Sequence, residues 1–484
     1  MPDGEPIVVT IGTAAPFTVG TISAATWKNP PVTDPTWRLT FQGLLWMKPL
    51  ARRAAQDGQQ ESLAALVAQA VQLHRVDPDP GANVSGWDEG TALRRLETEN
   101  CLYSLTRSAA LVPGMTADAA VLLGKRYYGP PYAAVHNHGL LANLRLVRAG
   151  DLLGRADWKS AAIKRMTAEA PLAFSTAGLT FEQASGYQGV NANLWEQAAG
   201  VLAASPGTES AVATLRKTVA AAWNAFAWET EPDGRIVQIG DSEEIAGRAG
   251  SGTARTLRDD QTGTIAGRWS WTDELTSYYT IRYGPSRRAH GQEDRAGGVT
   301  WSTLGTRVLV GPGKYTYDKA SAWYTWQVGP DSHNVAIPKG GAVKAGRTAK
   351  VRTSKVQASA HAWTIVDDIY NIPHTRSVNV SRDAHRLQVS DVFSKSALWR
   401  QHWHLDPGWT LVSGKVDGTA LTFQHTSGRR LTVTTTGRVS GIVKGRTSSI
   451  GGWHFPSFGT RTQAIDLQIR SNGTRATVTT FTVK

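Results

Sequence analysis

The sequence predicts an α+β chain with helices and strands in separate domains: helical hairpins packed as an array or toroid, then one large antiparallel β-sandwich. Apolar residues recur at helical spacing, among many alanines, from Trp37 to Phe226. After Ser242, short runs of Val, Thr, Trp and Tyr alternate with polar residues between turn-forming residues. The charge balance changes as well. Residues 1–245 carry 20 basic and 24 acidic side chains, whereas residues 246–484 carry 32 and 15.

The helical part is expected to follow an extended lead-in. Residues 1–35 are rich in Pro, Thr and Gly and predict an extended N-terminal segment. Leu39 to Leu50 and Leu63 to Leu73 then follow a helical period. Further helices are predicted at residues 91–108, 116–127, 137–153, 158–171, 189–205 and 209–226. Residues 36–245 therefore form the predicted helical domain, without the strict repeat of a regular solenoid.

Residues 246–484 are expected to form the β-sandwich domain. The glycine-rich residues 247–252 are a candidate hinge between the two domains. Strands are predicted at residues 278–283, 306–310, 351–356, 362–366, 378–380, 410–412, 431–435 and 476–483. Turn-forming residues separate these runs at intervals typical of sandwiches.

Composition excludes several classes of protein. The chain is 41% hydrophobic and 19% charged, which is typical of a globular protein and not of a disordered one. No run approaches the ~20 apolar residues of a membrane span. One cysteine in 484 residues excludes disulfides. The net charge of +13 favours a polyanionic partner, whether nucleic acid, anionic lipid or acidic polysaccharide.

The first candidate site is Val135-His136-Asn137-His138-Gly139, at the start of a predicted helix. Asn137 is a good N-cap residue, and Gly139 allows a ligand to approach closely. An Asn-His pair in this place would polarise and neutralise a carboxylate. A capping Asn beside a surface His explains the same residues without any function.

Three further segments carry candidate chemistry. Residues 178–188 hold Glu182 and Tyr187 ahead of a new helix, although a lone Tyr is most often a packing residue. Arg287-Arg288-Ala289-His290 places an imidazole in a cationic neighbourhood, which is also typical of a solvated strand edge. Residues 309–315 and 329–335 are, taken alone, turns between strands.

Together these segments resemble the heparinase II/III-like family of polysaccharide lyases. That family has an Asn-His-Gly motif and a Glu–Ser–Tyr loop on a helical toroid, and three motifs on the following β-sandwich. The motifs are an H-x-H-x-D strand, an LVD-P-G-x-Y turn and a D-S-x-H-N segment. The matching residues here, in the same order, are 137–139, 182–187, 290–294, 309–315 and 331–334, and Trp87-Asp88-Glu89-Gly90 with Arg94 is also similar. The resemblance covers about residues 27–400 and implies an incomplete (α/α) toroid followed by an antiparallel β-sandwich.

The resemblance also implies the reaction: β-elimination in a uronic-acid-containing polysaccharide, giving 4,5-unsaturated products. Removal of the C5 proton beside a carboxylate adds negative charge, so that carboxylate must be neutralised. The implied neutralising residues are Asn137 and His138, helped by Arg94. Tyr187 is the implied base, acid or both, and His290 the opposing base or a group that lowers the pKa of Tyr187.

Substrate-binding roles are implied for a further group of residues. Glu182 is expected to orient a neighbouring group rather than touch the sugar, and indole faces such as that of Trp87 stack on sugar rings. The expected substrate-binding residues are Arg94, Glu182, Trp87, Gln188 and Arg288. No organic or redox cofactor is implied.

One departure concerns zinc. Several family members hold a structural zinc ion with the second His of H-x-H, the Asp of the LVD turn and the His of S-x-H-N. The corresponding residues here are Gln292, Gly311 and His333, so only His333 keeps a ligand type that zinc prefers. We therefore expect no metal at this place, and no effect of chelators on activity or melting temperature. His402 and His404, on one face of a strand, are an alternative metal-binding pair.

The expected partner is an acidic polysaccharide such as heparin, heparan sulfate, hyaluronan, alginate or glucuronan. Neither nucleic acid nor a membrane is expected, and the oligomeric state stays open. Two alternatives are a non-catalytic lyase homologue that binds polysaccharide, and a glycoside hydrolase using carboxylates such as Asp88, Glu89 and Glu182. The polar start at Met1 does not resemble a signal peptide. A secreted or periplasmic location is nevertheless expected, with the chain as the mature form.

Overall fold

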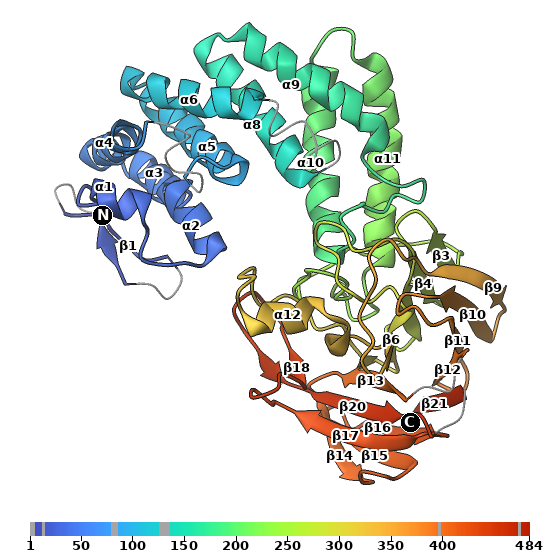
Figure 1. Ribbon diagram of the computed structural model, residues 1–484. Helices are drawn as coiled ribbons and strands as arrows, with labels where there is room; N and C mark the ends of the chain where they lie inside the picture. The colour runs from blue at the N-terminus through green and yellow to red at the C-terminus, as the bar shows by residue number, and fades with distance from the viewer. Residues whose placement is uncertain (1–4, 12–14, 79–85, 125–135, 395–397, 473–475) are drawn as a thin grey trace. The chain divides into compact units, whose positions relative to one another are not determined.

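The computed structural model divides into two compact units that interleave along the chain (Figure 1). It describes residues 5–11, 15–78, 86–124, 136–394, 398–472 and 476–484. Unit 1 comprises residues 1–173 and 194–216, and unit 2 comprises residues 174–193 and 217–484. Helices α10 (Ser185–Ala203) and α11 (Glu209–Trp228) therefore each lie partly in one unit and partly in the other.

The chain up to residue 228 is predominantly helical, as its apolar periodicity predicts. Successive helices such as α5 and α6, or α8 and α9, pack against each other as hairpins. The buried side chains of α4 include Leu63, Leu66 and Leu73, which lie on one helical face. The elements are α1 (Ala24–Lys28), α2 (Pro35–Gln42), α3 (Met47–Gln56), α4 (Gln60–Val76), α5 (Glu89–Thr106), η1 (Ala109–Leu111), α6 (Val112–Leu123), α8 (Asn137–Leu153), α9 (Ala156–Glu169), η2 (Ala170–Leu172), α10 and α11. The helix predicted at 116–127 extends into residues outside the described part of the chain.

The lead-in is more structured than the predicted extended segment. Strand β1 (Val8–Val9) pairs antiparallel with β2 (Phe17–Thr18), and α1 follows. Aromatic packing holds this segment against α2. The rings of Phe17 and Trp27 lie 5.4 and 4.6 Å from that of Phe41, and Trp27 is buried. Pro and Gly indicated the loops here, but not the aromatic contacts.

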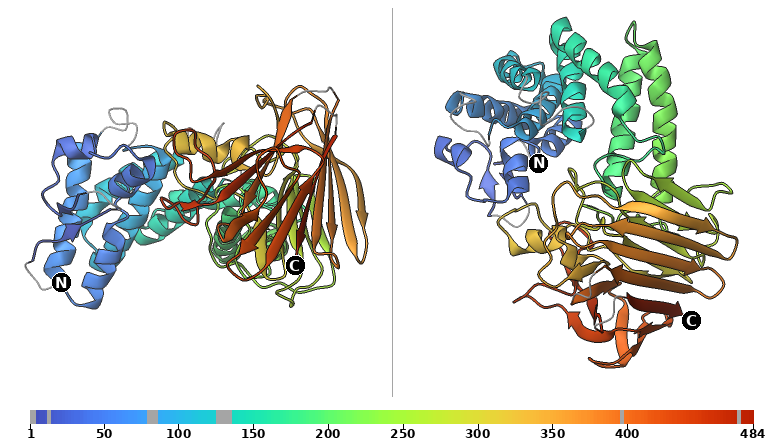
Figure 2. Two further views of the ribbon diagram at one scale, coloured as in Figure 1. Left: turned by 90° about the horizontal axis from the view of Figure 1, so that it is seen from below. Right: turned by 45° about the vertical axis from the view of Figure 1, so that its right-hand side comes forward.

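Unit 2 contains two large antiparallel sheets packed face to face (Figure 2). One sheet has the order β14-β15-β16-β21-β12-β11-β10-β9. The other has the order β17-β20-β13-β7-β6-β5-β4-β3, with β8 paired to β13. A single apolar core joins them, with Trp301 and Trp403 from one sheet and Val389 and Phe481 from the other. Alternating burial along β10 and β21 reflects the alternating sequence pattern.

The strands of the sandwich begin at residue 256. Their bounds are β3 (Thr256–Asp259), β4 (Thr264–Arg268), β5 (Tyr278–Arg282), β6 (Gly298–Thr303), β7 (Thr306–Leu309), β8 (Ala336–Pro338), β9 (Lys350–Val356), β10 (Ala360–Asp367), β11 (His374–Ser381), β12 (Arg386–Phe393), β13 (Trp399–Leu405), β14 (Trp409–Ser413), β15 (Ala420–His425), β16 (Arg430–Thr435), β17 (Arg438–Lys444), β18 (Trp453–His454), β19 (Thr462–Gln463), β20 (Ile465–Arg470) and β21 (Ala476–Val483). Helix α12 (Ala322–Val328) and η3 (Pro330–Ser332) lie between β7 and β8. The predicted fold class, helices followed by an antiparallel sandwich, is confirmed.

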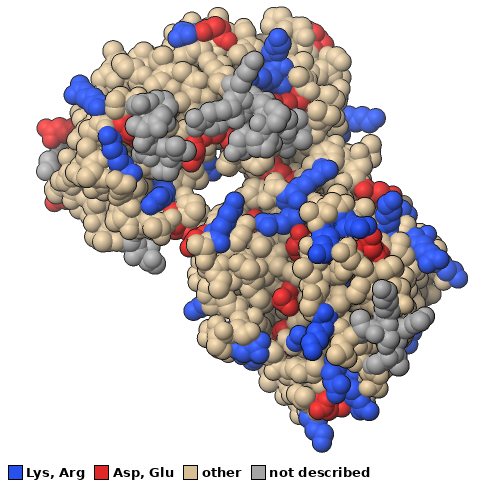
Figure 3. All heavy atoms as spheres, viewed as in Figure 1, with Lys and Arg blue, Asp and Glu red and all other residues tan. Residues whose placement is uncertain are grey.

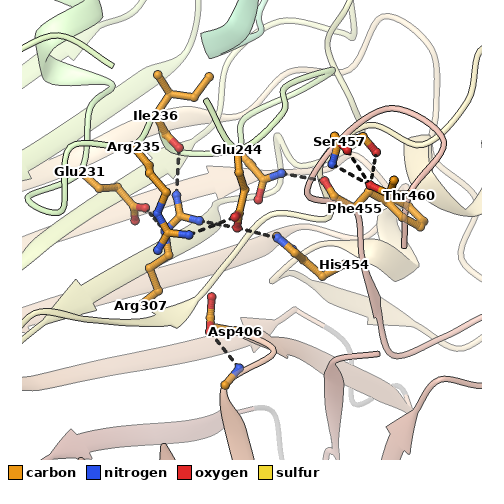
Figure 4. A network of polar contacts seen from close by, with 12 residues as sticks. Glu231, Arg235, Ile236, Glu244, Arg307, Asp406, His454, Phe455, Ser457 and Thr460 are labelled. Carbon is orange, nitrogen blue, oxygen red and sulfur yellow. Dashed lines mark hydrogen bonds and ion pairs between the residues drawn. The ribbon is translucent and has the colours of Figure 1, made fainter. Parts of the chain in front are cut away.

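The segment after α11 is fastened to the sandwich by a buried polar network (Figure 4). Arg307 on β7 pairs with Glu231 and Glu244, and its Nη1 lies 2.8 Å from Glu244 Oε1. Arg235 Nη1 and His454 Nε2 lie 3.0 and 2.9 Å from carboxylate oxygens of Glu244. This anchoring matters because the same segment carries a carboxylate of the candidate site.

Two glycines of the predicted hinge at residues 247–252, Gly247 and Gly250, are closely packed. A Cβ atom added to Gly247 would overlap the side chain of Thr230, and one added to Gly250 would overlap Trp271. The amide of Gly247 also donates to the carbonyl of Gly234 at 2.8 Å. Glycine is therefore required here for close approach rather than for flexibility.

No helix among the described residues combines the length and the apolar character that crossing a membrane requires.

Candidate functional site

The candidate residues form two clusters, one in each unit. In unit 2, the rings of Tyr187 and His290 are stacked, with centroids 3.5 Å apart and planes inclined by 7°. Tyr187 lies in the first turn of α10, and His290 lies in the loop between β5 and β6. Both rings are partly exposed. Two residues that are 103 positions apart are thus brought into direct contact.

Two buried carboxylates flank His290. Its Nδ1 lies 3.3 Å from Asp241 Oδ2, and its Nε2 lies 3.6 Å from Glu182 Oε2. The side chains of Asp241 and Glu182 are each 3% exposed, whereas that of His290 is 15% exposed. Glu182 therefore faces the imidazole from a position withdrawn from solvent, which suits the orienting role expected of it.

Backbone hydrogen bonds hold the three segments together. The amide of Asp241 donates to the His290 carbonyl at 2.8 Å, and the amide of His290 donates to the Glu182 carbonyl at 3.2 Å. Gly240 makes this junction possible. Its φ is +59°, and an added Cβ would lie 2.5 Å from the Gln183 carbonyl oxygen and 2.6 Å from that of His290. A residue with a side chain would separate the segments.

Two glutamines fix the orientation of Asp241. Gln292 Nε2 donates to Asp241 Oδ1 at 3.0 Å, and Gln327 Nε2 donates to the same oxygen at 3.4 Å. Gln327 Oε1 accepts from the amides of Tyr315 and Thr316, so its own orientation is also set. The carboxylate is thus aimed at His290 by neighbours on separate segments.

Tyr317 contacts the hydroxyl of Tyr187, with 3.1 Å between the two oxygens. Burial, together with the negative charge of Asp241 and the neighbouring Tyr187, raises the pKa of Tyr317 well above its ordinary value. Tyr317 therefore keeps its proton at neutral pH. A neutral phenol can donate to the Tyr187 oxygen, which favours any negative charge developing there.

Asp241 and Tyr317 were not among the predicted site residues. Asp241 stands 49 positions before His290, in a Gly-Asp-Ser turn that carries no recognisable motif. Tyr317 lies two residues after Tyr315, the last residue of the predicted turn motif, and that proximity was the one available signal.

Gln188 and Arg288 differ from one another in exposure. Gln188 is fully buried, with Oε1 accepting from the Thr180 amide and Nε2 donating to two backbone carbonyls. This burial contradicts a substrate-binding role, and Gln188 instead fixes the loop that leads to Glu182. Arg288 is exposed, and its guanidinium lies 5.6 Å from the centroid of the Phe181 ring.

The cluster in unit 1 is built around the start of α8. The N-cap is His136, whose Nδ1 accepts from the His138 amide at 3.2 Å, so the prediction that Asn137 caps this helix is wrong. Asn137 is the first helical residue and is buried, and Val135 lies outside the described residues. The Nδ1 atom of His138 lies 3.5 Å from Glu89 Oε2, and its side chain is 30% exposed.

Asp88, Glu89 and Arg94 lie on or beside α5 in the same cluster. Asp88 caps α5 by accepting from the Thr91 amide at 2.8 Å. Burial raises the pKa of Asp88, although the Thr91 hydrogen bonds and the charges of His138 and Arg94 oppose the increase. Arg94 Nη1 donates to the Gly90 carbonyl at 2.9 Å.

Trp87 cannot serve as a sugar-stacking surface. Its side chain is 0% exposed, its Nε1 donates to the Asp77 carbonyl at 3.1 Å, and the Arg95 guanidinium lies 4.4 Å from its ring centroid. The expected substrate-binding role of Trp87 is therefore contradicted. The residue belongs to the core of unit 1.

The residues at the family's zinc positions do not fit the ion. Gln292 could offer only its neutral amide oxygen, because its Nε2 donates to Asp241 Oδ1 and to the Gly313 carbonyl. Gly311 has no room for a carboxylate, because an added Cβ would overlap the carbonyl oxygen of Gln238. His333 remains as the single imidazole, which is fewer donors than a zinc site requires.

Lys and Arg side chains are frequent over the sandwich on the face shown in Figure 3. They are interspersed with fewer acidic side chains, in agreement with the charge of +17 over residues 246–484.

Comparisons with known proteins agree with this architecture. Residues 266–482 match the family model described as heparinase II/III-like, C-terminal. The chain is similar to solved heparinase III, with a TM-score of 0.78 and 14% identity, covering 94% of this chain and 78% of that one. For heparan sulfate lyase HepC from Pedobacter heparinus the TM-score is 0.65 and the identity 16%, covering 97% and 80%. For Streptomyces coelicolor A3 chondroitin AC lyase, solved with chondroitin sulphate, the TM-score is 0.57 and the identity 13%. The match covers 93% of this chain and 75% of that one. No curated protein matches the chain in sequence.

Proposed function

Because residues 266–482 match the heparinase II/III-like, C-terminal family model, we propose that the chain is a polysaccharide lyase acting on a uronic-acid polymer. The chemical class is a carbon–oxygen lyase working by β-elimination. Solved proteins of similar fold include heparan sulfate lyase and chondroitin AC lyase, which favours a glycosaminoglycan over alginate or glucuronan as the substrate.

The stacked pair of Tyr187 and His290 carries the proposal. β-Elimination needs a group that takes the C5 proton and a group that protonates the leaving oxygen at C4. The Tyr187 hydroxyl can serve either purpose, since the phenol of Tyr317 lies 3.1 Å from its oxygen. We assign His290, which stacks on the Tyr187 ring between two carboxylates, the role of the opposing base.

The unit 1 cluster supplies the groups expected to neutralise the uronate carboxylate. We assign this role to Asn137 and His138, with Arg94 as a further cation. A neutral amide and an imidazole donate hydrogen bonds that strengthen as negative charge accumulates on the carboxylate during C5 deprotonation. Glu89, 3.5 Å from His138 Nδ1, orients that ring.

Hydrolysis is less well supported than elimination. A glycosidase needs two carboxyl groups able to reach opposite sides of the glycosidic bond. Glu182 and Asp241 are buried and directed at His290, and Asp88 caps a helix. A binding-only homologue is disfavoured by the ordered arrangement of Tyr187 and its neighbours, because binding alone does not need a supported proton-transfer pair.

The test is an absorbance assay across heparin, heparan sulfate, hyaluronan, chondroitin sulfate, alginate and glucuronan. Elimination creates a conjugated C4–C5 double bond that absorbs in the ultraviolet, whereas hydrolysis releases reducing ends without it. We expect new absorbance with at least one glycosaminoglycan. Reducing ends without absorbance would indicate a hydrolase, and binding without either signal would indicate a non-catalytic homologue.

We also propose a secreted or periplasmic location, because long anionic polysaccharides do not cross the apolar interior of a membrane. Separate measurement of the protein in culture medium, periplasm and cytoplasm tests this location directly.

A further inference from the structure

Two histidines and an aspartate lie together on one face of the sandwich, on neighbouring strands. His402 and His404 are two residues apart on β13, so their side chains point to the same side of the sheet. On the paired strand β20, Asp466 lies opposite His404 and Gln468 lies opposite His402. All three ionisable side chains are buried, with residue exposures of 2–3%.

The donor atoms of these residues converge. Asp466 Oδ1 lies 3.2 Å from His402 Nδ1 and 3.9 Å from His404 Nε2. One ligand atom from each of the three residues lies within 4.8 Å of the other two. Around a tetrahedral zinc ion with bonds of about 2.0–2.1 Å, neighbouring ligand atoms are separated by roughly 3.3 Å. Small side-chain movements would therefore bring all three atoms to bonding distance.

One of these atoms has no hydrogen-bond partner. His404 Nε2 is buried, and none of the described residues hydrogen-bonds to it. The ring of His404 is oriented by a hydrogen bond to the backbone of Asp331, which leaves Nε2 directed toward the cluster. An unpaired buried nitrogen loses hydration without compensation. A bound cation would supply the missing interaction.

The surrounding groups resemble the outer shell of a metal site. Gln468 Nε2 donates to Asp466 Oδ2 at 2.6 Å. His402 Nδ1 lies 3.2 Å from both carboxylate oxygens, and Oδ1 is the oxygen that also faces His404. The far nitrogen of His402, Nε2, faces the Asp331 carboxylate at 3.7 Å. Metal-binding histidines commonly have a carboxylate or carbonyl at the nitrogen that does not bind the metal.

We propose that His402, His404 and Asp466 bind one zinc ion. Two imidazoles and a carboxylate are ligands that zinc accepts, and water takes the fourth position. His402 and Asp331 line a cavity of about 450 Å³, which gives the ion and the water a route to the cluster. These ligands differ from the residues at the family's zinc positions, and the proposal does not depend on the proposed lyase activity. It replaces the expectation, drawn from Gln292 and Gly311, that chelators leave the melting temperature unchanged.

The role assigned to the ion is structural. It crosslinks β13 and β20 within the sheet that also contains β7. A metal that binds the folded sandwich and not the unfolded chain raises the melting temperature in proportion to its occupancy.

The experiment uses the full chain without an affinity tag, stripped with a chelator and dialysed into chelator-free buffer. Zinc binding is measured by titration calorimetry, and the melting temperature is recorded with and without zinc. We expect one zinc per chain and a higher melting temperature with zinc. Cobalt added instead of zinc should give the visible bands of a four-coordinate ion, a readout that needs no variant and no catalysis.

Variants locate the site. His404→Gln and Asp466→Asn retain side-chain volume but remove a ligand, and each should weaken zinc binding by more than about 100-fold. His361→Gln is the matched control, because His361 is a buried imidazole of the other sheet that contacts the Tyr279 hydroxyl. This control should bind zinc as the wild type does. Absence of zinc and cobalt binding in the wild type, or unchanged binding in both site variants, would overturn the proposal.

Discussion

At the scale of single residues, the ring of Tyr187 fixes its position, whereas the proposed proton transfer uses its hydroxyl. The ring stacks on His290, and the hydroxyl contacts Tyr317. Positioning and proton transfer therefore rest on different atoms, and a substitution can remove one without the other.

Tyr187→Phe should lower kcat by about 100-fold or more, because proton-transfer groups typically contribute that much. The ring and its stacking on His290 are retained, so melting temperature and substrate binding should change little. Initial rates of ultraviolet absorbance measure the loss. Tyr103→Phe, at a partly exposed tyrosine of unit 1, is the control and should keep full activity. A Tyr187→Phe enzyme with more than about a tenth of the wild-type rate would refute the assignment.

Asn137→Ala and His138→Ala should each lower kcat more than they raise KM. Their proposed hydrogen bonds to the uronate strengthen only as charge develops, so the transition state loses more than the ground state. Full kinetic curves separate the two parameters. A rise in KM with unchanged kcat would instead identify both residues as contacts that bind the substrate uniformly.

The sequence motifs predicted Tyr187 and His290 as site residues but could not predict the groups that contact them. Asp241 reaches His290 from a segment 49 residues away, through a turn whose geometry depends on contacts with Gln183 and His290. Motif spacing contains no information about such contacts. The burial of Trp87 could not be predicted from the sequence either, because an indole side chain can stack on a sugar ring or pack in an apolar core.

At the scale of elements, four loops and the start of α10 form the unit 2 cluster. Predictions of long elements succeeded where one periodic signal was strong: α8 has the predicted bounds Asn137–Leu153, and β21 the predicted bounds Ala476–Val483. Short, irregular segments such as β1 and β2 were missed, because their structure follows from aromatic contacts with α2.

Gly240→Ala should destabilise unit 2 and disrupt the cluster. The new Cβ would meet the carbonyl oxygens of Gln183 and His290, in addition to the cost of a positive φ. We expect a loss of unfolding free energy about 2 kcal/mol larger than in Gly428→Ala, which has a φ of +88° and open space around it. Urea unfolding measures both. Equal losses would mean that the junction of segments tolerates a side chain.

A buried histidine on β11 predicts how the sandwich responds to pH. His374 lies between Asp367 and Asp391, at 2.8 and 2.7 Å, and Arg376 also pairs with Asp391. Burial alone would lower the pKa of His374, but the two aspartates raise it to about 9.

Because the folded-state pKa of His374 is raised, its stabilising contribution is complete below pH ~6.5 and is lost as pH rises through about 9. The unfolding free energy should fall by up to roughly 3 kcal/mol across this window. His374→Gln should be less stable at pH ~6.5 and should lack this decrease. Urea unfolding followed by tryptophan fluorescence provides the comparison. A parallel decrease in the variant would attribute the pH dependence to other groups.

At the scale of the whole molecule, the charge of +17 over residues 246–484 is the main electrostatic feature. Dispersed Lys and Arg side chains create a long-range field that concentrates a polyanion near the protein. Salt screens such a field, because the Debye length falls to about 8 Å at physiological ionic strength.

Raising NaCl from about 50 to about 200 mM should therefore increase KM for a long glycosaminoglycan several-fold while kcat changes less. Steady-state kinetics at constant pH measure both parameters. A short oligosaccharide with few charges is the control, and its KM should depend only weakly on salt. Equal salt dependence for both substrates would show that the charge of the sandwich does not assist capture.

The interleaving of the two units restricts where recombination can divide the gene without separating residues of one site. The chain passes between the units at residues 173/174, 193/194 and 216/217. The second of these passages lies within α10 and the third within α11. A recombination breakpoint between residues 245 and 256, just before the first strand of the sandwich, would leave Tyr187 and Asp241 on one fragment and His290 on the other. Domain shuffling at that point would transmit a sandwich that carries His290 without Tyr187 and Asp241. Selection for activity consequently acts on the two halves as one evolutionary unit.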